Sequence, residues 1–299
     1  MSVNSSRVGI MYEALIRKLL NWANDVSNIK VVLIVGSRAR SKYPADEWSD
    51  LDAIIVTSNP DFYVSTTDWI GNMGTPILTF IEPTATGVGI ERRVLYENML
   101  DVDFSIVPFE SFSQLTKGDA STKTKNEIKD LVNRGIISII DKAGFVAEVQ
   151  KLVASYPSLI YRNPNQEEFA EIVNDFLYHA VFAAKHLKRG ELWWTATCLD
   201  CHMQRLMLRM MEWHAHATHS GEFDTWFRGR FLEKWADSQI LQGLTESFAR
   251  YDSGDIKRAL RASMALFRQM GTEVACKLSL VYPTDADEKV ASWIDTCIT

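Results

Sequence analysis

The hydrophobic pattern of this 299-residue chain changes about halfway along, and this change constrains the fold more than any other feature. Between about residue 30 and about residue 140, short β-rich runs such as KVVLIVG, LDAIIVT and DVDFSIVP alternate with turn signals. After Pro164, apolar residues recur at helical spacing almost to the end. We therefore predict an α+β protein: a mixed β-sheet domain with flanking helices over residues 1–155, then an all-α helical bundle over residues 156–299, joined by SYPSLIYRNPNQ.

Two long helices are predicted after the junction. Asn163, Pro164 and Gln166 form a cap, a first-turn proline and a capping-box partner, and Gly190 ends the helix that they begin. The next helix carries apolar residues at an unbroken alternation of three and four, from Leu192 through Ala196, Leu199, Met203, Leu206 and Met210 to Trp213.

Composition and charge narrow the class of protein. With 46% apolar residues the chain can bury a full core, and it has no apolar run of about 18 residues that would cross a membrane. Because the first ten residues lack the pattern of a signal peptide and the four cysteines are sparse, we expect a cytoplasmic protein with free thiols. A net charge of −6 disfavours nucleic acid as a partner and suits a cationic one.

Residues 35–56 contain the first candidate site. Gly36 follows a buried strand and frees the backbone to turn, so that Ser37, Arg38 and the amides after them can hold a phosphate. Asp50 and Asp52 begin the next strand and share one of its faces. Two carboxylates so placed repel each other unless a cation such as Mg²⁺ lies between them. A solvated strand start is the alternative for Asp-x-Asp alone.

A later strand, DVDFSIVP, supplies a third carboxylate. Asp101 and Asp103 lie on one face of it, and Val102, Phe104 and Ile106 lie on the other. Acidic groups entering a sheet among apolar neighbours cost desolvation free energy unless they are paired or bind a metal. From the residues alone, either aspartate could be the ligand.

The Gly-Ser pair, the Asp-x-Asp and the later strand aspartate together resemble the signature of the DNA polymerase β-like nucleotidyltransferase superfamily. The resemblance implies two Mg²⁺ ions, a nucleoside triphosphate, and attack of an acceptor hydroxyl on the α-phosphorus with pyrophosphate leaving. It favours Asp103 over Asp101 as the third acid and as the group that accepts the hydroxyl proton, because Asp103 stands before the Val-Pro strand end. Glu82 is a weaker candidate for that base.

The second half resembles the aminoglycoside 6-adenylyltransferases, which modify streptomycin. The similar segments are EEFAEIVNDFLYHAVFAAKHLKRGELWW, LMLRMMEWH and VYPTDADEKVASWI, in the expected order. The resemblance implies functional roles for Asp175 and Lys185. Leu177 stands where the family pattern has an aromatic residue, Asp175 where it has Glu, and Met211 where it has Leu, so the acceptor pocket is expected to differ in detail.

The residues of the long helix independently suggest an acceptor surface. Its acidic-aromatic stripe, defined as Glu168, Glu171, Asp175, Tyr178 and Phe182, follows helical spacing and would attract a polycation; a solvated charged face is the alternative. Lys185 lies about 15 Å further along the axis than Asp175, within reach of a triphosphate, unless it is an ordinary surface lysine.

Other tempting residues are set aside. CLDCH lacks a second ligand pair at zinc-finger spacing, and His214, His216 and His219 are interpreted as solvated helix-end histidines.

From the candidate sites and the resemblance, we expect Mg²⁺-dependent transfer of AMP from ATP to an aminoglycoside hydroxyl. Streptomycin is the expected acceptor. A non-catalytic nucleotide-binding or antitoxin-like module, or transfer to another small molecule or a protein, remains the alternative. The sequence leaves the oligomeric state, the nucleotide preference and the modified hydroxyl open.

Overall fold

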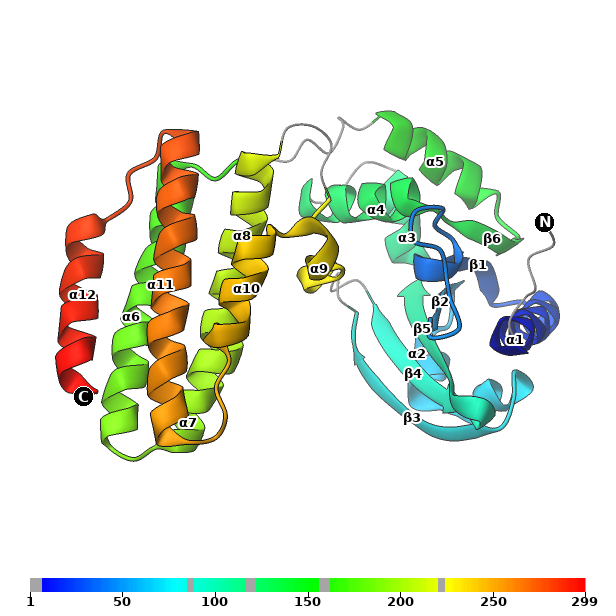
Figure 1. The fold of residues 1–299 in the computed structure, drawn as a ribbon. Coiled ribbons are helices and arrows are strands. Elements are labelled where there is room, and N and C mark those ends of the chain that lie inside the picture. Colours follow the sequence, from blue (N-terminus) through cyan, green and yellow to red (C-terminus); the bar gives the residue numbers. More distant parts are fainter. Residues whose placement is uncertain (1–6, 85–88, 117–121, 156–161, 220–223, 299) are drawn as a thin grey trace. The chain divides into compact units, whose positions relative to one another are not determined.

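The computed structural model describes residues 7–84, 89–116, 122–155, 162–219 and 224–298. It divides into two compact units, Met1–Ile160 and Tyr161–Thr299 (Figure 1). The first unit contains a mixed sheet with flanking helices and the second is helical, so the predicted fold class is confirmed. Residues 156–161, which make up much of the predicted junction, lie outside the described residues.

The first unit is built on one six-stranded sheet with the order β3-β4-β5-β2-β1-β6. β2 and β5 run parallel, and the other neighbouring pairs are antiparallel. The strands are β1 (Ile29–Val35), β2 (Leu51–Thr57), β3 (Pro76–Pro83), β4 (Ile90–Tyr96), β5 (Leu100–Pro108) and β6 (Ile137–Asp141).

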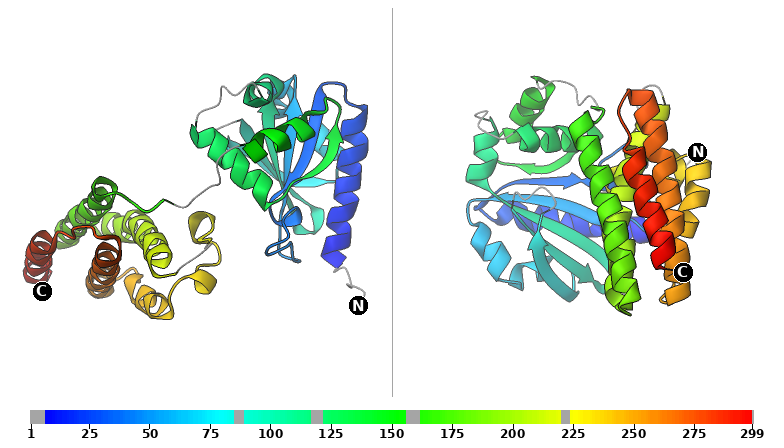
Figure 2. Two further views of the ribbon diagram at one scale, coloured as in Figure 1. Left: turned by 90° about the horizontal axis from the view of Figure 1, so that it is seen from above. Right: turned by 90° about the vertical axis from the view of Figure 1, so that its left-hand side faces the viewer.

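Helices cover both faces of this sheet, because the central strands are apolar on both sides (Figure 2, left). One face packs against α1, with Leu15 and Leu19 buried against Ile34 and Phe104. The other face packs against α4 and α5 through a smaller cluster that includes Val153. The helices of this unit are α1 (Arg7–Asp25), α2 (Pro60–Ser65), α3 (Phe109–Thr116), α4 (Thr122–Arg134) and α5 (Phe145–Ser155).

The second unit is a bundle in which α11 contacts α6, α8 and α10, and α12 contacts α6 (Figure 1). Its helices are α6 (Gln166–Lys188), α7 (Leu192–Thr197), α8 (Gln204–Thr218), α9 (Leu232–Trp235), α10 (Ser238–Ser247), α11 (Ser253–Leu278) and α12 (Thr284–Cys297). A π-helical turn, η4 (Cys198–Met203), joins α7 to α8. Within the described ranges, no helix has the length and apolarity needed to span a membrane.

Two details of the predicted bundle are wrong. The cap of α6 is Asn165, not Asn163, because the Asn165 side chain accepts from the Glu168 N–H while the Glu168 carboxylate accepts from the Asn165 N–H. His214 is buried rather than solvated, and its Nε2 lies 2.6 Å from Glu273 Oε2 on α11. That pairing satisfies a polar group that would otherwise be buried without a partner.

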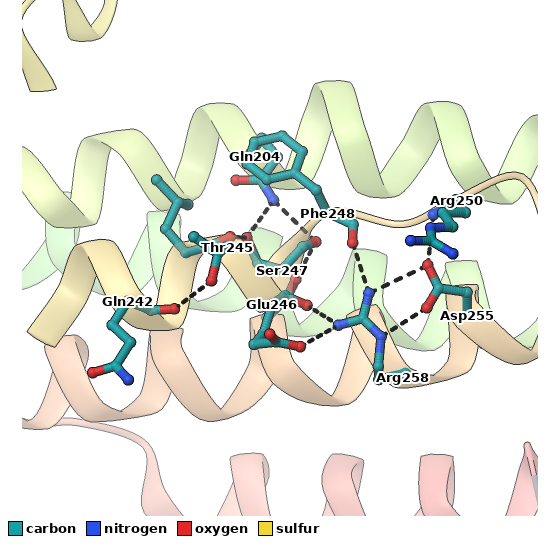
Figure 3. A network of polar contacts seen from close by, with 11 residues as sticks. Gln204, Gln242, Thr245, Glu246, Ser247, Phe248, Arg250, Asp255 and Arg258 are labelled. Carbon is teal, nitrogen blue, oxygen red and sulfur yellow. Dashed lines mark hydrogen bonds and ion pairs between the residues drawn. The ribbon is translucent and has the colours of Figure 1, made fainter. Parts of the chain in front are cut away.

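A polar network fastens the end of α10 to the start of α11 (Figure 3). The Arg258 guanidinium donates to the Glu246 carbonyl oxygen in the last turn of α10 at 2.7 Å and to that of Phe248, the residue after the helix, at 2.9 Å. It also pairs with Asp255, Nε to Oδ1 2.8 Å, one turn earlier on α11. Because the last carbonyls of a helix have no partner within the helix, this arginine serves as the C-terminal cap of α10.

Candidate active site

The strand topology brings three strand ends to one edge of the sheet. β1 is antiparallel to β2, and β2 is parallel to β5, so the end of β1 meets the beginnings of β2 and β5. In this register Val35 lies opposite Asp52, and Asp52 lies opposite Asp103. Polar residues that are far apart in the sequence therefore become neighbours here.

Gly36 forms the predicted sharp corner at the end of β1. Its φ is +66°, a conformation that other residues rarely adopt. A Cβ at this position would lie 2.0 Å from Asp52 Oδ2, which is far inside van der Waals contact. Glycine is therefore required both by the backbone conformation and by the close approach of the Asp52 carboxylate.

Ser37, directly after the corner, is 3% exposed. Among the described residues, its Oγ has no hydrogen-bond partner. Buried hydroxyls are nearly always hydrogen-bonded, so an orphaned one beside an acidic site points to a partner that binds there. The sequence prediction that Ser37 contacts a phosphate is consistent with this arrangement.

The guanidinium of Arg38, which was predicted to bind the nucleotide, contacts backbone carbonyl oxygens and an aromatic ring of the protein itself. Its Nε donates to the Asp50 carbonyl oxygen at 2.8 Å and its Nη2 to the Ser49 carbonyl oxygen at 2.7 Å. Its guanidinium carbon lies 3.6 Å from the centre of the Tyr12 ring, a cation–π contact. These contacts fix the backbone that carries Asp50 at the mouth of the site.

Asp50, Asp52 and Asp103 form a carboxylate triad, in which one oxygen from each lies within 4.8 Å of the others. Burial raises the pKa of Asp103 to about 7; Arg93 opposes this shift, while the charges of Glu91 and Asp52 add to it. Carboxylates held this close and partly desolvated repel one another, and oxygen ligands at such separations suit a hard dication. The triad therefore fits Mg²⁺.

Asp101, the competitor for the third position, faces a different partner. Its Oδ1 accepts a hydrogen bond of 2.8 Å from the Tyr12 hydroxyl on α1, and this carboxylate together with burial raises the pKa of Tyr12. Asp101 is absent from the carboxylate groupings found among the described residues, whereas Asp103 is present. The geometry favours Asp103 as the third acid.

Three further charged residues lie at this site on the neighbouring strands: Glu82, Glu91 and Arg93. Of these, only Glu82 was predicted from the sequence. Arg93 on β4 lies opposite Asp103 in the register, and its Nη2 is 3.4 Å from Asp103 Oδ2 and 3.0 Å from Glu91 Oε1. Its Nε pairs with Glu82 at 2.7 Å. The alternation of Glu91 and Arg93 on one face of β4 was the available signal, because charged residues rarely share the half-buried face of a central strand without partners.

The side chains of the acidic-aromatic stripe on α6 differ in whether they already contact other residues of the protein. Glu168 uses its carboxylate in the α6 capping box and in an ion pair with Arg162. Glu171 and Tyr178 are exposed. Asp175 accepts from two imidazoles, with its Oδ1 lying 2.6 Å from His179 Nδ1 and 3.0 Å from His202 Nε2. Glu171 and Tyr178 are thus the most available members of the stripe.

Lys185 is exposed on α6, and its ammonium lies 5.8 Å from the centre of the Trp293 ring on α12. That contact holds the side chain by a cation–π interaction at the upper limit of its range. Its nucleotide-binding role stays a prediction.

Comparison with known proteins places the chain in a family. A family model described as streptomycin adenylyltransferase matches residues 11–297. The chain belongs to this family, and the predicted nucleotidyltransferase resemblance is confirmed.

The matched relatives are distant but cover nearly the whole chain. An aminoglycoside 6-adenylyltransferase of Campylobacter jejuni is 21% identical over 282 residues, 92% of each chain. One from Staphylococcus aureus is 22% identical over 278 residues, 89% of this chain and 93% of its own. The crystal structure of an aminoglycoside 6-adenyltransferase from Bacillus subtilis aligns with 95% of this chain and 97% of its own, at 17% identity and a TM-score of 0.44.

Proposed function

We propose that this protein transfers AMP from ATP to a hydroxyl of an aminoglycoside and releases pyrophosphate. Streptomycin is the proposed preferred acceptor. The observation that carries the proposal is the convergence of Asp50, Asp52 and Asp103 beside the Gly36–Ser37 corner. Membership of the streptomycin adenylyltransferase family and the aminoglycoside 6-adenylyltransferase relatives support the substrate class.

Asp50, Asp52 and Asp103 would hold the metal, for which we propose two Mg²⁺ ions. When bound, Mg²⁺ would neutralise the phosphate oxygens and stabilise the charge that develops on the α-phosphoryl group. The residues fit this role because three carboxylates within 4.8 Å of one another repel unless a cation is present. Gly36 contributes by leaving room for the Asp52 carboxylate against the turn.

In the proposed reaction the acceptor oxygen forms a bond to the α-phosphorus, and the bond from that phosphorus to the oxygen bridging the α- and β-phosphates breaks. Ser37 donates its buried hydroxyl to a phosphate oxygen, which supplies the partner that Oγ otherwise lacks among the described residues. Asp103 accepts the proton of the attacking hydroxyl. Arg93, 3.4 Å away, lowers the pKa of Asp103 against the effect of burial and so keeps the base more ionised at neutral pH.

For acceptor binding we propose the acidic-aromatic stripe of α6. Glu171 and Tyr178 offer an exposed carboxylate and an exposed ring, the groups that bind guanidinium by charge-assisted hydrogen bonds and cation–π contact. Asp175 adds a carboxylate that its two histidine neighbours partly occupy. Glu168 contributes chiefly by starting the helix. Lys185 is proposed to reach the triphosphate.

The test is pyrophosphate release by the full chain with ATP, Mg²⁺ and a panel of aminoglycosides. We expect release to depend on the aminoglycoside and to be fastest with streptomycin, and Asp52→Asn to abolish it. ATP binding without pyrophosphate release for any acceptor would contradict transfer and favour a non-catalytic nucleotide-binding module.

A further inference from the structure

A second cluster of metal-ligand side chains lies in the helical unit, apart from the carboxylate triad. This histidine cluster consists of Asp175, His179 and His202, and one ligand atom of each lies within 4.8 Å of the others. Asp175 and His179 are one turn apart on α6, and His202 comes from the π-helical turn η4. The two imidazole rings lie 3.9 Å apart between centroids, so both ring edges converge on the same carboxylate.

The donor set of this cluster differs from that of the triad. Imidazole nitrogens are borderline ligands that favour zinc-like transition metals, which also accept a carboxylate oxygen, whereas Mg²⁺ prefers oxygen ligands alone. Three protein ligands with one position left for water is a common zinc arrangement. The histidine cluster therefore suits a metal of another class than the one the triad fits.

The distances are close to those that a metal would need. With zinc–nitrogen and zinc–oxygen bonds of about 2.0–2.1 Å, tetrahedral ligand atoms lie about 3.3 Å apart. Asp175 Oδ1 lies 2.6 Å from His179 Nδ1 and 3.0 Å from His202 Nε2. Outward movements of less than about 1 Å, within the reach of side-chain rotation, would open the cluster to this geometry.

His202 lies in the π-helical turn η4, which packs against α6. Its Nε2 contacts Asp175 Oδ1, while Leu199 and Met203 of the same turn are buried in the core. Such turns often occur at functional sites.

Neighbouring thiols do not join the ligand set. Cys198 is buried, its Sγ lies 3.9 Å from the His179 carbonyl oxygen, and it belongs to no ligand grouping found among the described residues. Cys201 is exposed and adjacent to His202, so an experiment has to exclude it explicitly.

We propose that Asp175, His179 and His202 bind one zinc-like transition-metal dication in the helical unit. The site uses none of the triad residues, and its metal binding can be measured without AMP transfer. Because Asp175 is also a proposed acceptor contact, metal binding and acceptor binding through this carboxylate exclude one another. Arg205, whose Nη2 lies 3.4 Å from His202 Nδ1, is exposed and free to swing away when the metal replaces the His202 proton.

The test measures Zn²⁺ affinity of the chelator-stripped full chain by competition with a chromophoric zinc indicator, without ATP or aminoglycoside. Excess Mg²⁺ fills the triad during the titration. The Cys201→Ser variant serves as the reference chain in order to remove the exposed thiol, and Co²⁺ in place of Zn²⁺ reports the ligands by its visible spectrum. We expect one Zn²⁺ per chain, and a Co²⁺ spectrum of a nitrogen–oxygen site without thiolate charge-transfer bands.

Two ligand variants and a matched control decide the outcome. In the Cys201→Ser chain, His179→Gln and His202→Gln should each weaken Zn²⁺ binding by about tenfold or more. His186→Gln should leave it unchanged, because His186 pairs with Glu191 and belongs to no ligand grouping found in the described residues. Absence of Zn²⁺ binding, or equal affinity in all three variants with unchanged circular dichroism, would overturn the proposal and leave a hydrogen-bond network only.

Discussion

The carboxylate triad of the sheet unit and the histidine cluster of the helical unit both gather three ligand side chains, but they are built by different means. The triad depends on strand register, since Asp52 and Asp103 are paired residues of parallel strands and Gly36 makes room for Asp52. The histidine cluster depends on one helical turn of α6 and on the π turn that presents His202.

This difference decides how each site responds to substitution. Strand pairing surrounds the triad with half-buried charges, so changes there alter several neighbours at once. Glu171 and Tyr178 on the α6 stripe are exposed, so changes to them act mainly on what binds. We expect the effects of substitution to decrease from the sheet edge to the helical surface.

The largest effect is expected from the triad. Asp52→Asn and Asp103→Asn should each lower turnover by more than about 10²-fold, because each removes a group that stabilises developing charge. Asp101→Asn is the matched control on the same strand and should retain turnover, since an amide oxygen can still accept from Tyr12. Steady-state pyrophosphate release measures all three. Loss of turnover in Asp101→Asn together with a fully active Asp103→Asn would reverse the assignment of the third acid.

Gly36→Ala should be nearly as damaging. The added Cβ would collide with Asp52 Oδ2 at 2.0 Å, and the φ of +66° adds strain of about 1–2 kcal/mol. Gly144→Ala is the control, because its φ is +71° but no described atom lies within 4 Å of the Cβ that would be added. We expect both variants to unfold at lower denaturant concentration and only Gly36→Ala to lose turnover. Equal turnover in the two variants would mean that the close approach of Asp52 is unimportant.

How much of the two sites the sequence predicts follows from how each is assembled. Asp50 and Asp52 were predicted because Asp-x-Asp begins a strand directly after the Gly-Ser corner, so that both carboxylates share one face. The choice of Asp103 over Asp101 came from the family resemblance. The contribution of Glu91 and Arg93 was missed because it requires the pairing of β4 with β5, which no local pattern specifies. The histidine cluster was missed because it requires the packing of η4 against α6, two segments whose contact no local pattern specifies.

The sequence at the start of α6 contains two possible capping boxes, two residues apart. Asn163 and Asn165 flank Pro164, and each has a capping-box partner three residues later, Gln166 and Glu168 respectively. The structure uses Asn165, because Glu168 is anionic at the positive end of the helix and also pairs with Arg162. The sequence signals predicted the helix itself, while a local ion pair between Arg162 and Glu168 favours Asn165 as its cap.

A moderate effect is expected on the helical surface. Tyr178→Ala should raise the KM for streptomycin about two- to fivefold, the scale of one exposed cation–π contact, and leave the KM for ATP unchanged. Tyr178 is 68% exposed, so its truncation should cost little stability. Tyr251→Ala, at 64% exposure in the same unit, is the control and should change neither KM. An unchanged streptomycin KM in Tyr178→Ala would remove this residue from the acceptor surface.

The smallest effect concerns stability and pH at the α10–α11 network. Hydrogen bonds from Arg258 lower the pKa of Asp255 to about 2, below the value of about 3.9 for an unfolded chain. A carboxyl group whose pKa is depressed by folding stabilises the fold at pH values above its unfolded-state pKa, and this contribution is lost as the pH falls through about 2. Asp255→Asn should therefore lower the Tm at pH 7. The difference in Tm between the wild-type protein and this variant should shrink as the pH falls from 4 to 2.

Thermal unfolding of the two chains across this pH range provides the measurement. Arg258→Gln should lower the Tm as well, since it also removes the cap of α10. A difference between wild type and Asp255→Asn that stays constant down to pH 2 would show that the ion pair contributes nothing to stability.

Mass spectrometry of streptomycin after incubation with the protein, ATP and Mg²⁺ tests the central claim most directly. We predict that streptomycin gains the mass of one AMP, that label on the α-phosphate of ATP appears in the product, and that label on the γ-phosphate appears in pyrophosphate. Asp52→Asn should yield unmodified streptomycin. Streptomycin that stays unmodified with wild-type protein, or that gains the γ-phosphate instead, would contradict the proposed function.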